Sequence, residues 1–230
     1  MAEVARIRTP LSELELLEAL RDGHRVVFGV DPSASRLAVA WAQCALEHAR
    51  GKALDGYDLG NVTCGPSWQG DYYTLACDER VSRNPDVWKR LTLRFRSFAA
   101  AEEGAASYWR TIAGRYVRVL AYFDRADAAG AGHTLSILGW YTALEAAYIA
   151  GMVKLEHYCS TVLIDQIELV TEPQEQGDSP DCAGEMRSVL SAADIERALA
   201  VNLLSLQRQT SEDPLFACHG DPDRETVPDP

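Results

Sequence analysis

The stretch that decides the fold of this chain is residues 41–63, which read WAQCALEHARGKALDGYDLGNVT. Its first half has a helical pattern: at about 100° per residue, Leu37, Trp41 and Cys44 share one apolar face. Glu47 falls at the margin of that face. A carboxyl group at the edge of an apolar surface is partly desolvated, which disfavours its charged form and raises its pKa. A general acid that works near neutral pH needs such a shift, so the pattern predicts that Glu47 is a catalytic acid.

The second half of the stretch supplies a turn and a candidate binding residue. Gly51 follows the helix, and residues 55–58 (Asp-Gly-Tyr-Asp) are typical of a turn. Gly60 then lets the backbone approach a ligand closely, and Asn61 can hydrogen-bond a polar ligand. The sequence therefore predicts Asn61 as a substrate-binding residue.

This stretch resembles the lysozyme-like glucosaminidases, closest to glycoside hydrolase family 73, whose members cleave bacterial peptidoglycan. The resemblance is carried by three short runs: Ala45-Leu46-Glu47, Arg50-Gly51-Lys52 and Leu59-Gly60-Asn61. They are similar to the family's A-L-E-(T/S)-x-x-G helix end and to the end of its N-N-x-(F/L)-G segment. His48 replaces the Thr or Ser of the first motif, and Gly56 and Tyr57 stand where the family has asparagines. The resemblance implies that Glu47 is the catalytic acid, whereas a lone helix Glu would more often be a solvated carboxylate.

Further matches extend the resemblance over about residues 34 to 160. They are Phe95-Arg96-Ser97-Phe98, Ser107-Tyr108-Trp109, Tyr116, Gly139-Trp140-Tyr141-Thr142 and Tyr148. Trp140 stands at the position of a tyrosine that lines the family's cleft, where its face can stack on a sugar ring and Tyr141 can supply the missing phenol hydrogen bond. The resemblance thus implies substrate binding by Trp140, Tyr141 and Tyr148. The alternative for most of these aromatic residues is a place in the core.

A second carboxylate is expected in residues 62–90, which are rich in Gly, Pro, Tyr, Thr and Asp and predict a β-hairpin or small irregular sheet. Asp71 follows Gly70 at the expected tip, where it can swing over a cleft and activate water. Glu79 is the next candidate, and both have the alternative of a solvated loop charge. We therefore expect Glu47, Asp71 and Glu79 as catalytic residues, in that order.

The expected fold class is mainly α, an α+β lysozyme-like fold in which a small β-hairpin lobe faces the catalytic helix. Other elements follow from periodicity and turn residues. Helices are expected at about 10–20, from an Asp31-Pro32 start to near Gly51, at 99–121, at 143–155 and at 191–209. Short extended or strand-like runs are expected at 26–30 and 164–170, and a small-residue loop at 128–132. The domains expected are an N-terminal lead-in (1–33), a glucosaminidase domain (34–165), a linker (166–190), and a C-terminal helix with a disordered tail (191–230).

Composition limits the partners. With 47% hydrophobic residues the chain is globular, and its formal net charge of −12 argues against a nucleic-acid partner. Peptidoglycan glycan strands, held by local groove contacts, are the partner that the resemblance implies. No cofactor and no metal are expected, because a zinc site from His157, Cys159, Cys182 and His219 lacks the usual C-x-x-C spacing. Cys64 and Cys77 either form a disulfide or remain thiols.

The N-terminus has no continuous apolar core and carries acids from Glu3 onward, so no signal peptide is expected. No apolar run reaches about 18 residues, so no transmembrane segment is expected. Action in the periplasm or cell wall would then require delivery by a phage, a holin system or a specialised secretion system, with the C-terminal helix as the site for a delivery or virion partner.

The function that the sequence favours is hydrolysis of a β-1,4 glycosidic bond between N-acetylglucosamine and N-acetylmuramic acid, with Glu47 as general acid. One alternative is a lytic transglycosylase, in which a hydroxyl of the substrate replaces water. A second is a non-catalytic wall-binding or virion structural protein that keeps the fold.

Overall fold

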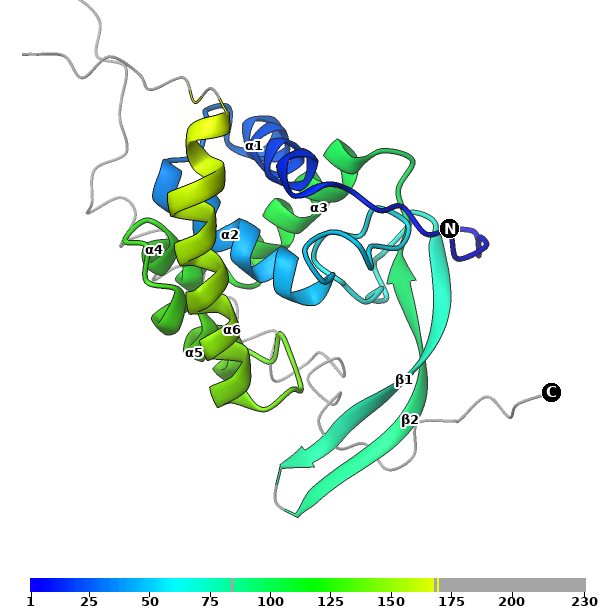
Figure 1. Cartoon of the computed structure of the whole chain (residues 1–230). Coiled ribbons are helices and arrows are strands. Elements are labelled where there is room, and N and C mark those ends of the chain that lie inside the picture. Colours follow the sequence, from blue (N-terminus) through cyan, green and yellow to red (C-terminus); the bar gives the residue numbers. More distant parts are fainter. Residues whose placement is uncertain (84, 168, 170–230) are drawn as a thin grey trace, which may run out of the picture. The chain divides into compact units, whose positions relative to one another are not determined.

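The computed structural model describes residues 1–83, 85–167 and 169 (Figure 1). Their helices and strands are α1 (Glu13–Phe28), α2 (Ala34–Glu47), β1 (Tyr72–Arg83), β2 (Asp86–Arg96), α3 (Ala101–Gly114), α4 (Leu120–Phe123), α5 (Ala128–Ile137) and α6 (Glu145–Tyr158). The described residues of 1–80 and 88–172 form one compact unit, of which the hairpin tip, residues 81–87, is not part. Helices with a two-stranded hairpin confirm the expected fold class.

Helix α2 is the central helix of this unit. Each residue from Leu37 to Ala45 is buried, and the helix packs against α1, α4 and α6. Its N-cap is Ser33, whose side chain accepts a hydrogen bond from the backbone N–H of Arg36 at 3.1 Å. The predicted cap at Asp31 is therefore wrong by two residues, and the carboxylate of Asp31 instead forms an ion pair with Arg25.

Helix α1 is longer than the sequence pattern indicates. It begins with a Ser12 and Glu15 capping box and continues to Phe28, where Gly29 ends it in the left-handed conformation (φ 77°). The extended run expected at 26–30 is therefore wrong. Tertiary packing explains the difference, because α1 lies along α3 and buries its apolar face there.

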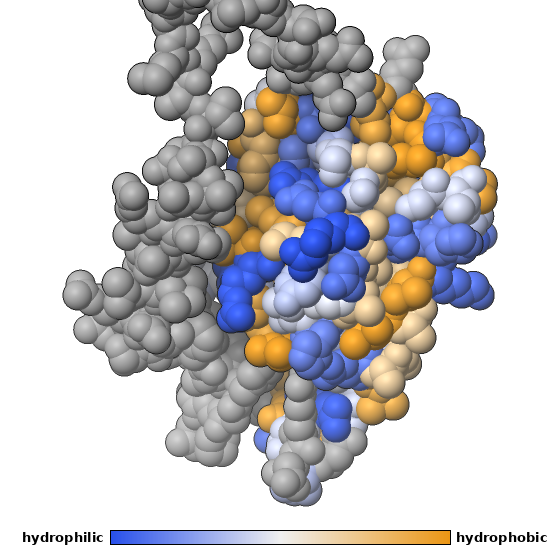
Figure 2. All heavy atoms as spheres, turned by 90° about the vertical axis from the view of Figure 1, so that its left-hand side faces the viewer, coloured by the Kyte–Doolittle hydropathy of each residue, from blue (hydrophilic) through white to orange (hydrophobic). Residues whose placement is uncertain are grey.

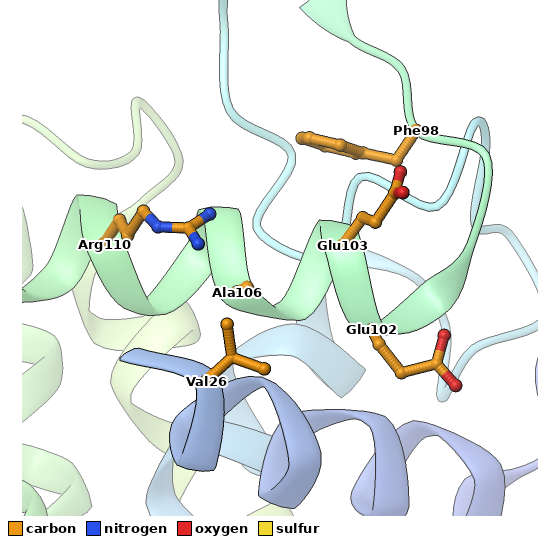
Figure 3. A pocket seen from close by; sticks show the side chains of 6 residues that line it. All are labelled: Val26, Phe98, Glu102, Glu103, Ala106 and Arg110. Carbon is orange, nitrogen blue, oxygen red and sulfur yellow. The ribbon is translucent and has the colours of Figure 1, made fainter. Parts of the chain in front are cut away.

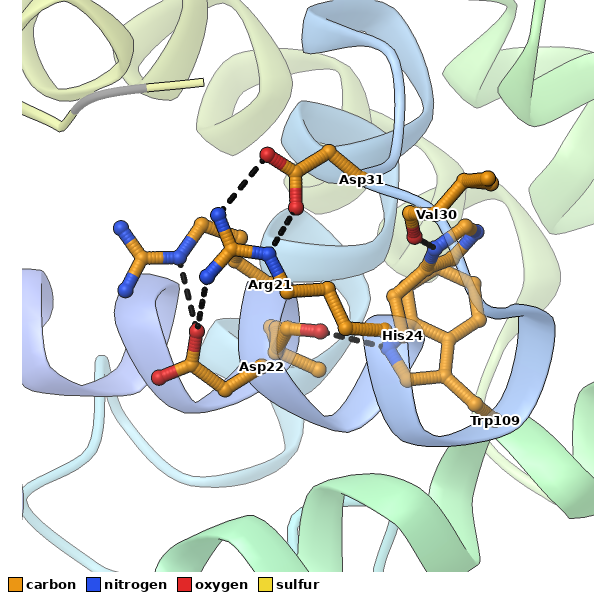
Figure 4. A network of polar contacts seen from close by, with 8 residues as sticks. Arg21, Asp22, His24, Val30, Asp31 and Trp109 are labelled. Carbon is orange, nitrogen blue, oxygen red and sulfur yellow. Dashed lines mark hydrogen bonds and ion pairs between the residues drawn. The ribbon is translucent and has the colours of Figure 1, made fainter. Parts of the chain in front are cut away.

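Polar contacts fix the end of α1 (Figure 4). The Nδ1 atom of His24 donates to the carbonyl of Val30 at 2.8 Å, and the indole N–H of Trp109 donates to the carbonyl of Leu20 at 2.7 Å. His24 is fully buried against Trp109, and this burial lowers its pKa. The two hydrogen bonds join α1, the turn that follows it and α3.

The N-terminal residues, expected as a lead-in, run alongside the loop that follows α2. The backbone N–H of Thr9 donates to Leu54 at 3.0 Å, and that of Gly56 donates to Ile7 at 2.9 Å. Arg6 and Arg8 pair with the buried Asp55 at 2.7 and 3.4 Å. Residues 1–33 thus contribute to the same compact unit as α2.

Three expectations in the second half of the unit differ from the structure. The small-residue loop expected at 128–132 is the start of α5, capped by Asp127, whose carboxylate accepts from the N–H of Gly130 at 2.7 Å. The strand expected at 164–170 begins instead as a 3₁₀ turn over Ile164–Gln166. The helix expected at 99–121 is divided into α3, a 3₁₀ turn and α4. Residues 170–190 of the expected linker, the helix expected at 191–209 and the tail lie outside the described residues.

The structure also bears on the two states considered for Cys64 and Cys77 and on the zinc site considered from the sequence. Cys44, Cys64, Cys77 and Cys159 are free thiols, so the structure contains no bond between Cys64 and Cys77. Among the described residues, no group of three or more His, Cys, Asp or Glu side chains is placed to hold a metal ion. Cys182 and His219 lie outside those residues.

The surface carries both hydrophobic and hydrophilic groups. On the face shown in Figure 2, hydrophobic residues are interspersed among hydrophilic ones. Within residues 1–83, 85–167 and 169, no helix is long and apolar enough to cross a membrane.

Gly104 allows the loop after α2 to pack against α3, and we expect Gly104→Ala to destabilise the protein. A Cβ atom there would lie 1.8 Å from the carbonyl oxygen of Tyr57, so the loop or the helix must move. We expect a loss of about 3 kcal/mol in the free energy of unfolding, measured by urea denaturation. Gly114→Ala, in the same helix with nothing within 4 Å of the new atom, is the control and should be neutral or slightly stabilising. Equal stability of the two variants would contradict the close packing.

Candidate active site

Glu47 is the last residue of α2 and lies half-buried at the end of the buried helix. The phenol of Tyr148 on α6 donates a hydrogen bond to its Oε1 at 2.7 Å. Burial raises the pKa of Glu47, while hydrogen bonds from Tyr148, Asn61 and Trp140 lower it and the charge of Glu79 raises it. Because burial is the largest effect, the carboxyl group keeps its proton to a higher pH than a solvated Glu.

The two tyrosines predicted to bind substrate form a stacked pair. The rings of Tyr141 and Tyr148 lie 3.6 Å apart between centroids at 11°, and both side chains are buried. The hydroxyl of Tyr141 donates to the carbonyl of Gly132 at 3.0 Å. Tyr148 therefore contacts the acid, and Tyr141 fixes the ring of Tyr148.

Trp140 and Asn61 lie near the Glu47 carboxyl group and belong to two different loops. Trp140 packs edge-on against Tyr116 at 4.7 Å and against Tyr108 at 6.0 Å between centroids. Asn61 is exposed and adopts the left-handed conformation (φ 51°), which Asn tolerates better than most residues. Both side chains act on the Glu47 carboxyl group and lower its pKa, against the effect of burial. The structure therefore brings together Glu47, Asn61, Trp140 and Tyr148.

Gly60 makes this arrangement sterically possible. A Cβ atom at Gly60 would lie 3.0 Å from the ring of Tyr108 and 3.4 Å from that of Trp140. The loop that carries Asn61 thus packs directly on the two aromatic side chains, whereas the close approach of Gly60 to a ligand stays a prediction.

Besides the buried Asp58, Glu79 on β1 is a carboxylate whose charge acts on the Glu47 carboxyl group. The hydroxyl of Thr142 donates to its Oε2 at 2.9 Å. Thr142 follows Trp140 and Tyr141 in the chain, so one short loop contacts both carboxyl groups. Thr142 belongs to the Gly139-Trp140-Tyr141-Thr142 motif, but the sequence predicts no role for it.

Asp71 lies at the base of the hairpin, directly before β1, and not at its tip. The expectation about its position is wrong, because the hairpin turns between Arg83 and Asp86. Its carboxylate accepts a hydrogen bond from the backbone N–H of Ala2 at 3.2 Å, and its carbonyl accepts from Ser97 at 2.9 Å. A catalytic role for Asp71 stays a prediction.

Asp58 and His48 are buried polar residues next to the loop that carries Asn61, and the sequence does not predict their burial. Asp58 is 2% exposed, and burial raises its pKa to about 8 against the opposing effect of Arg96. His48 is also buried, and burial lowers its pKa to about 4, so it is neutral near pH 7. A turn-rich sequence reads as exposed loop, so the burial of Asp58 has no local signal.

A separate pocket of about 350 Å³ lies between the end of α1 and α3 (Figure 3). It is lined by Val26, Phe98, Glu102, Glu103, Ala106 and Arg110. Phe98 belongs to a motif of the sequence resemblance, but none of the predicted catalytic or substrate-binding residues lines this pocket.

We expect Tyr148→Phe to raise the pKa of Glu47. The hydrogen bond from Tyr148 stabilises the ionised carboxylate and so lowers the pKa of Glu47. Without this bond, the effect of burial, which raises the pKa, is opposed less strongly. Carbon-detected NMR of the Glu47 carboxyl group during a pH titration measures this directly. Tyr158→Phe, which removes a hydroxyl bound to Glu13, is the matched control and should leave the Glu47 titration in place. An unchanged or lower pKa in Tyr148→Phe would refute the contact.

Comparison with solved structures places this chain near several cell-wall enzymes. A peptidoglycan hydrolase mutant from Sphingomonas sp. A1 is 20% identical with a TM-score of 0.49, over 66% of this chain and 95% of the other. The truncated glycoside hydrolase domain of FlgJ from Salmonella typhimurium is 20% identical with a TM-score of 0.43, over 64% and 97%. The catalytic domain of the autolysin Auto from Listeria monocytogenes is 17% identical with a TM-score of 0.46, over 70% and 89%.

No protein-family model matches the chain, and no curated protein sequence matches it significantly. The solved structures are peptidoglycan hydrolases and glycoside hydrolases by name, the class that the sequence resemblance names. These identities are 20% or lower and the TM-scores are below 0.5, so the chemistry of the site is argued from this chain's own residues.

Proposed function

We propose that this protein is a peptidoglycan hydrolase that cleaves a β-1,4 bond between N-acetylglucosamine and N-acetylmuramic acid. The observation that carries the proposal is the half-buried carboxyl group of Glu47 at the end of α2, which accepts a hydrogen bond from Tyr148 at 2.7 Å and has a raised pKa, together with a second carboxylate, Glu79, on β1. Two carboxyl groups in unlike environments are what glycoside hydrolysis requires. The family resemblance of residues 34–160 supports the same substrate.

Glu47 acts as the general acid. Its proton moves to the glycosidic oxygen as the bond to the anomeric carbon breaks, and the sugar passes through an oxocarbenium-like state. The Tyr148 hydroxyl then stabilises the carboxylate that remains, through the hydrogen bond already present at 2.7 Å. Asn61 is exposed beside the acid and binds a polar group of the sugar, and the face of Trp140 contacts the sugar ring.

Glu79 takes the proton of the attacking water. A hydrogen bond from Thr142 holds one oxygen of the Glu79 carboxylate at 2.9 Å, and this carboxylate accepts the proton. Of the two acids that the sequence proposed for this step, Glu79 is preferred over Asp71 because its charge acts on Glu47. The product of attack from the opposite face has inverted configuration.

Digestion of purified peptidoglycan, followed by mass spectrometry of the fragments, tests the function. We expect new reducing ends, and the terminal sugar identifies which of the two linkages is cut. An anhydro-muramic end would assign the protein to the lytic transglycosylases instead. Binding to the wall with no fragment released would assign a non-catalytic role.

The wall is the site of action in this proposal. A phage, a holin system or a specialised secretion system would deliver the protein, with residues 191–209 as the docking segment for a partner. Deletion of residues 185–230 should then impair delivery and leave cleavage of soluble fragments intact.

A further inference from the structure

One segment of the chain, residues 139–148, contacts two acids that lie far apart in the sequence. The hydroxyl of Tyr148 donates to Oε1 of Glu47 at 2.7 Å, and the hydroxyl of Thr142 donates to Oε2 of Glu79 at 2.9 Å. Glu47 ends α2, whereas Glu79 lies on β1. The segment therefore joins the hairpin to the helix that carries the proposed acid.

Two contacts with α5 hold this segment in place. The buried hydroxyl of Tyr141 donates to the carbonyl of Gly132 at 3.0 Å. The hydroxyl of Ser136 donates to Oε2 of Glu145, the first residue of α6, at 3.0 Å. Thr142 lies between Tyr141 and Glu145 in the sequence, so its hydroxyl is a fixed donor for the hairpin.

The hairpin depends on contacts with the rest of the chain, because two strands alone are marginally stable in water. At its base, the hydroxyl of Thr74 donates to Oε1 of Glu3 at 2.8 Å. Further along, Asp78 pairs with Arg90 at 3.4 Å, but their side chains are 64% and 66% exposed, and such a pair stabilises little. The hydrogen bond that Glu79 accepts thus attaches β1 to the helical part of the unit beyond the base of the hairpin.

We propose that Thr142 is a positioning residue, whose hydroxyl holds Glu79 and the middle of β1 against the segment that also binds Glu47 through Tyr148. The inference rests on the proposed function for its effect on catalysis, whereas the attachment of the hairpin does not. The acid and the base of an inverting glycosidase need a set separation, roughly 6.5 to 9.5 Å, to admit the attacking water. Loss of the hydrogen bond lets the Glu79 carboxylate move, and misplacement of the base acts on the chemical step more than on ground-state binding.

The experiment compares Thr142→Val and Thr142→Ser with wild type, by kinetics on soluble peptidoglycan fragments and by amide hydrogen exchange. Val keeps the branched shape of Thr and removes the hydroxyl, so we expect kcat to fall by about 10- to 100-fold with little change in KM. Exchange at the protected amides of residues 77–80 and 88–91 should accelerate at least about tenfold. Ser keeps the hydroxyl and should restore most of kcat and of the protection.

A double variant tests whether Thr142 acts through Glu79. If it does, adding Thr142→Val to Glu79→Gln should lower kcat by less than about twofold beyond Glu79→Gln alone, because the base is already missing. Independent effects multiply, so a further loss of about tenfold or more in the double variant would overturn the positioning role.

Thr74→Val is the matched control, since it removes a Thr hydroxyl from a Glu carboxylate, that of Glu3, at the base of the same strand. It should leave kcat and the exchange of residues 77–80 as in wild type. If Thr142→Val does not fold, Thr142→Ala replaces it, because Ala also lacks the hydroxyl and needs no more space than Thr.

The outcomes separate the two proposals. Exchange at the wild-type rate at residues 77–80 in folded Thr142→Val, or an unchanged kcat in that variant, overturns the positioning role. If wild type does not cleave peptidoglycan, the proposed function fails, and amide exchange alone then decides whether Thr142 holds the hairpin.

Discussion

The Glu47→Gln variant should fold like wild type and lose activity on peptidoglycan by about 10²- to 10⁴-fold. The amide has the shape of the carboxylic acid but has no proton to give to the leaving oxygen. Release of reducing ends from purified peptidoglycan measures the loss. Glu156→Gln, a change on α6 at a carboxylate bound by Ser160, is the matched control and should retain full activity. Turnover at the wild-type rate in Glu47→Gln would remove Glu47 from the mechanism.

The same variant should be more stable than wild type at neutral pH. The folded-state pKa of Glu47 is raised above its unfolded value, so the folded protein binds more protons than the unfolded chain between these two pKa values. The stability of wild type therefore decreases as pH rises through that interval. The Glu47→Gln variant does not show this decrease, because the Gln side chain does not ionise. Thermal unfolding near pH 7 should show the higher Tm in Glu47→Gln, and the difference should shrink toward about pH 4. A lower Tm at pH 7 would mean that the carboxyl group is stabilising, against the raised pKa.

The Glu79→Gln variant should show the second large loss, about 10²- to 10⁴-fold, because the amide cannot take the proton of the attacking water. The hydrogen bond from Thr142 can still form, so the hairpin should keep its place. Asp71→Asn is the matched control at the base of the same hairpin and should retain activity. The reverse result, with Asp71→Asn inactive and Glu79→Gln active, would restore the order that the sequence favours.

The sequence predicts those parts of the site that depend on local pattern. The helix that carries Glu47 has an unbroken apolar stretch and a clear end, so its type and the place of its acid follow from residues 34–51. The order of the motifs along the chain predicts that residues 139–142 and Tyr148 belong to the site. The structure places Trp140 and Tyr148 near Glu47. The packing of Gly60 on Tyr108 and Trp140 is not part of that prediction, because it involves residues far apart in the chain.

Other features depend on contacts between residues far apart in the chain. The packing of α1 on α3 extends a helix through a β-prone run, and the end of that run is set by Gly29. The hairpin is longer than its polar composition suggests, which moves Asp71 from tip to base. Asp58 is buried in a turn that the end of β2 contacts, through the N–H of Arg96 and the carbonyl of Val62 at 3.2 Å. No local sequence pattern predicts such a neighbour.

Proton NMR of the first-formed sugar anomer is the most direct test of the claim that Glu47 and Glu79 act on opposite sides of one glycosidic bond. Wild-type protein is mixed with soluble peptidoglycan fragments, and spectra are recorded before mutarotation equilibrates the products. We expect the α-anomer first, because water attacks the β-glycoside from the opposite face. Initial appearance of the β-anomer would contradict the account, since it requires a covalent or substrate-assisted route in which Glu79 does not activate the attacking water.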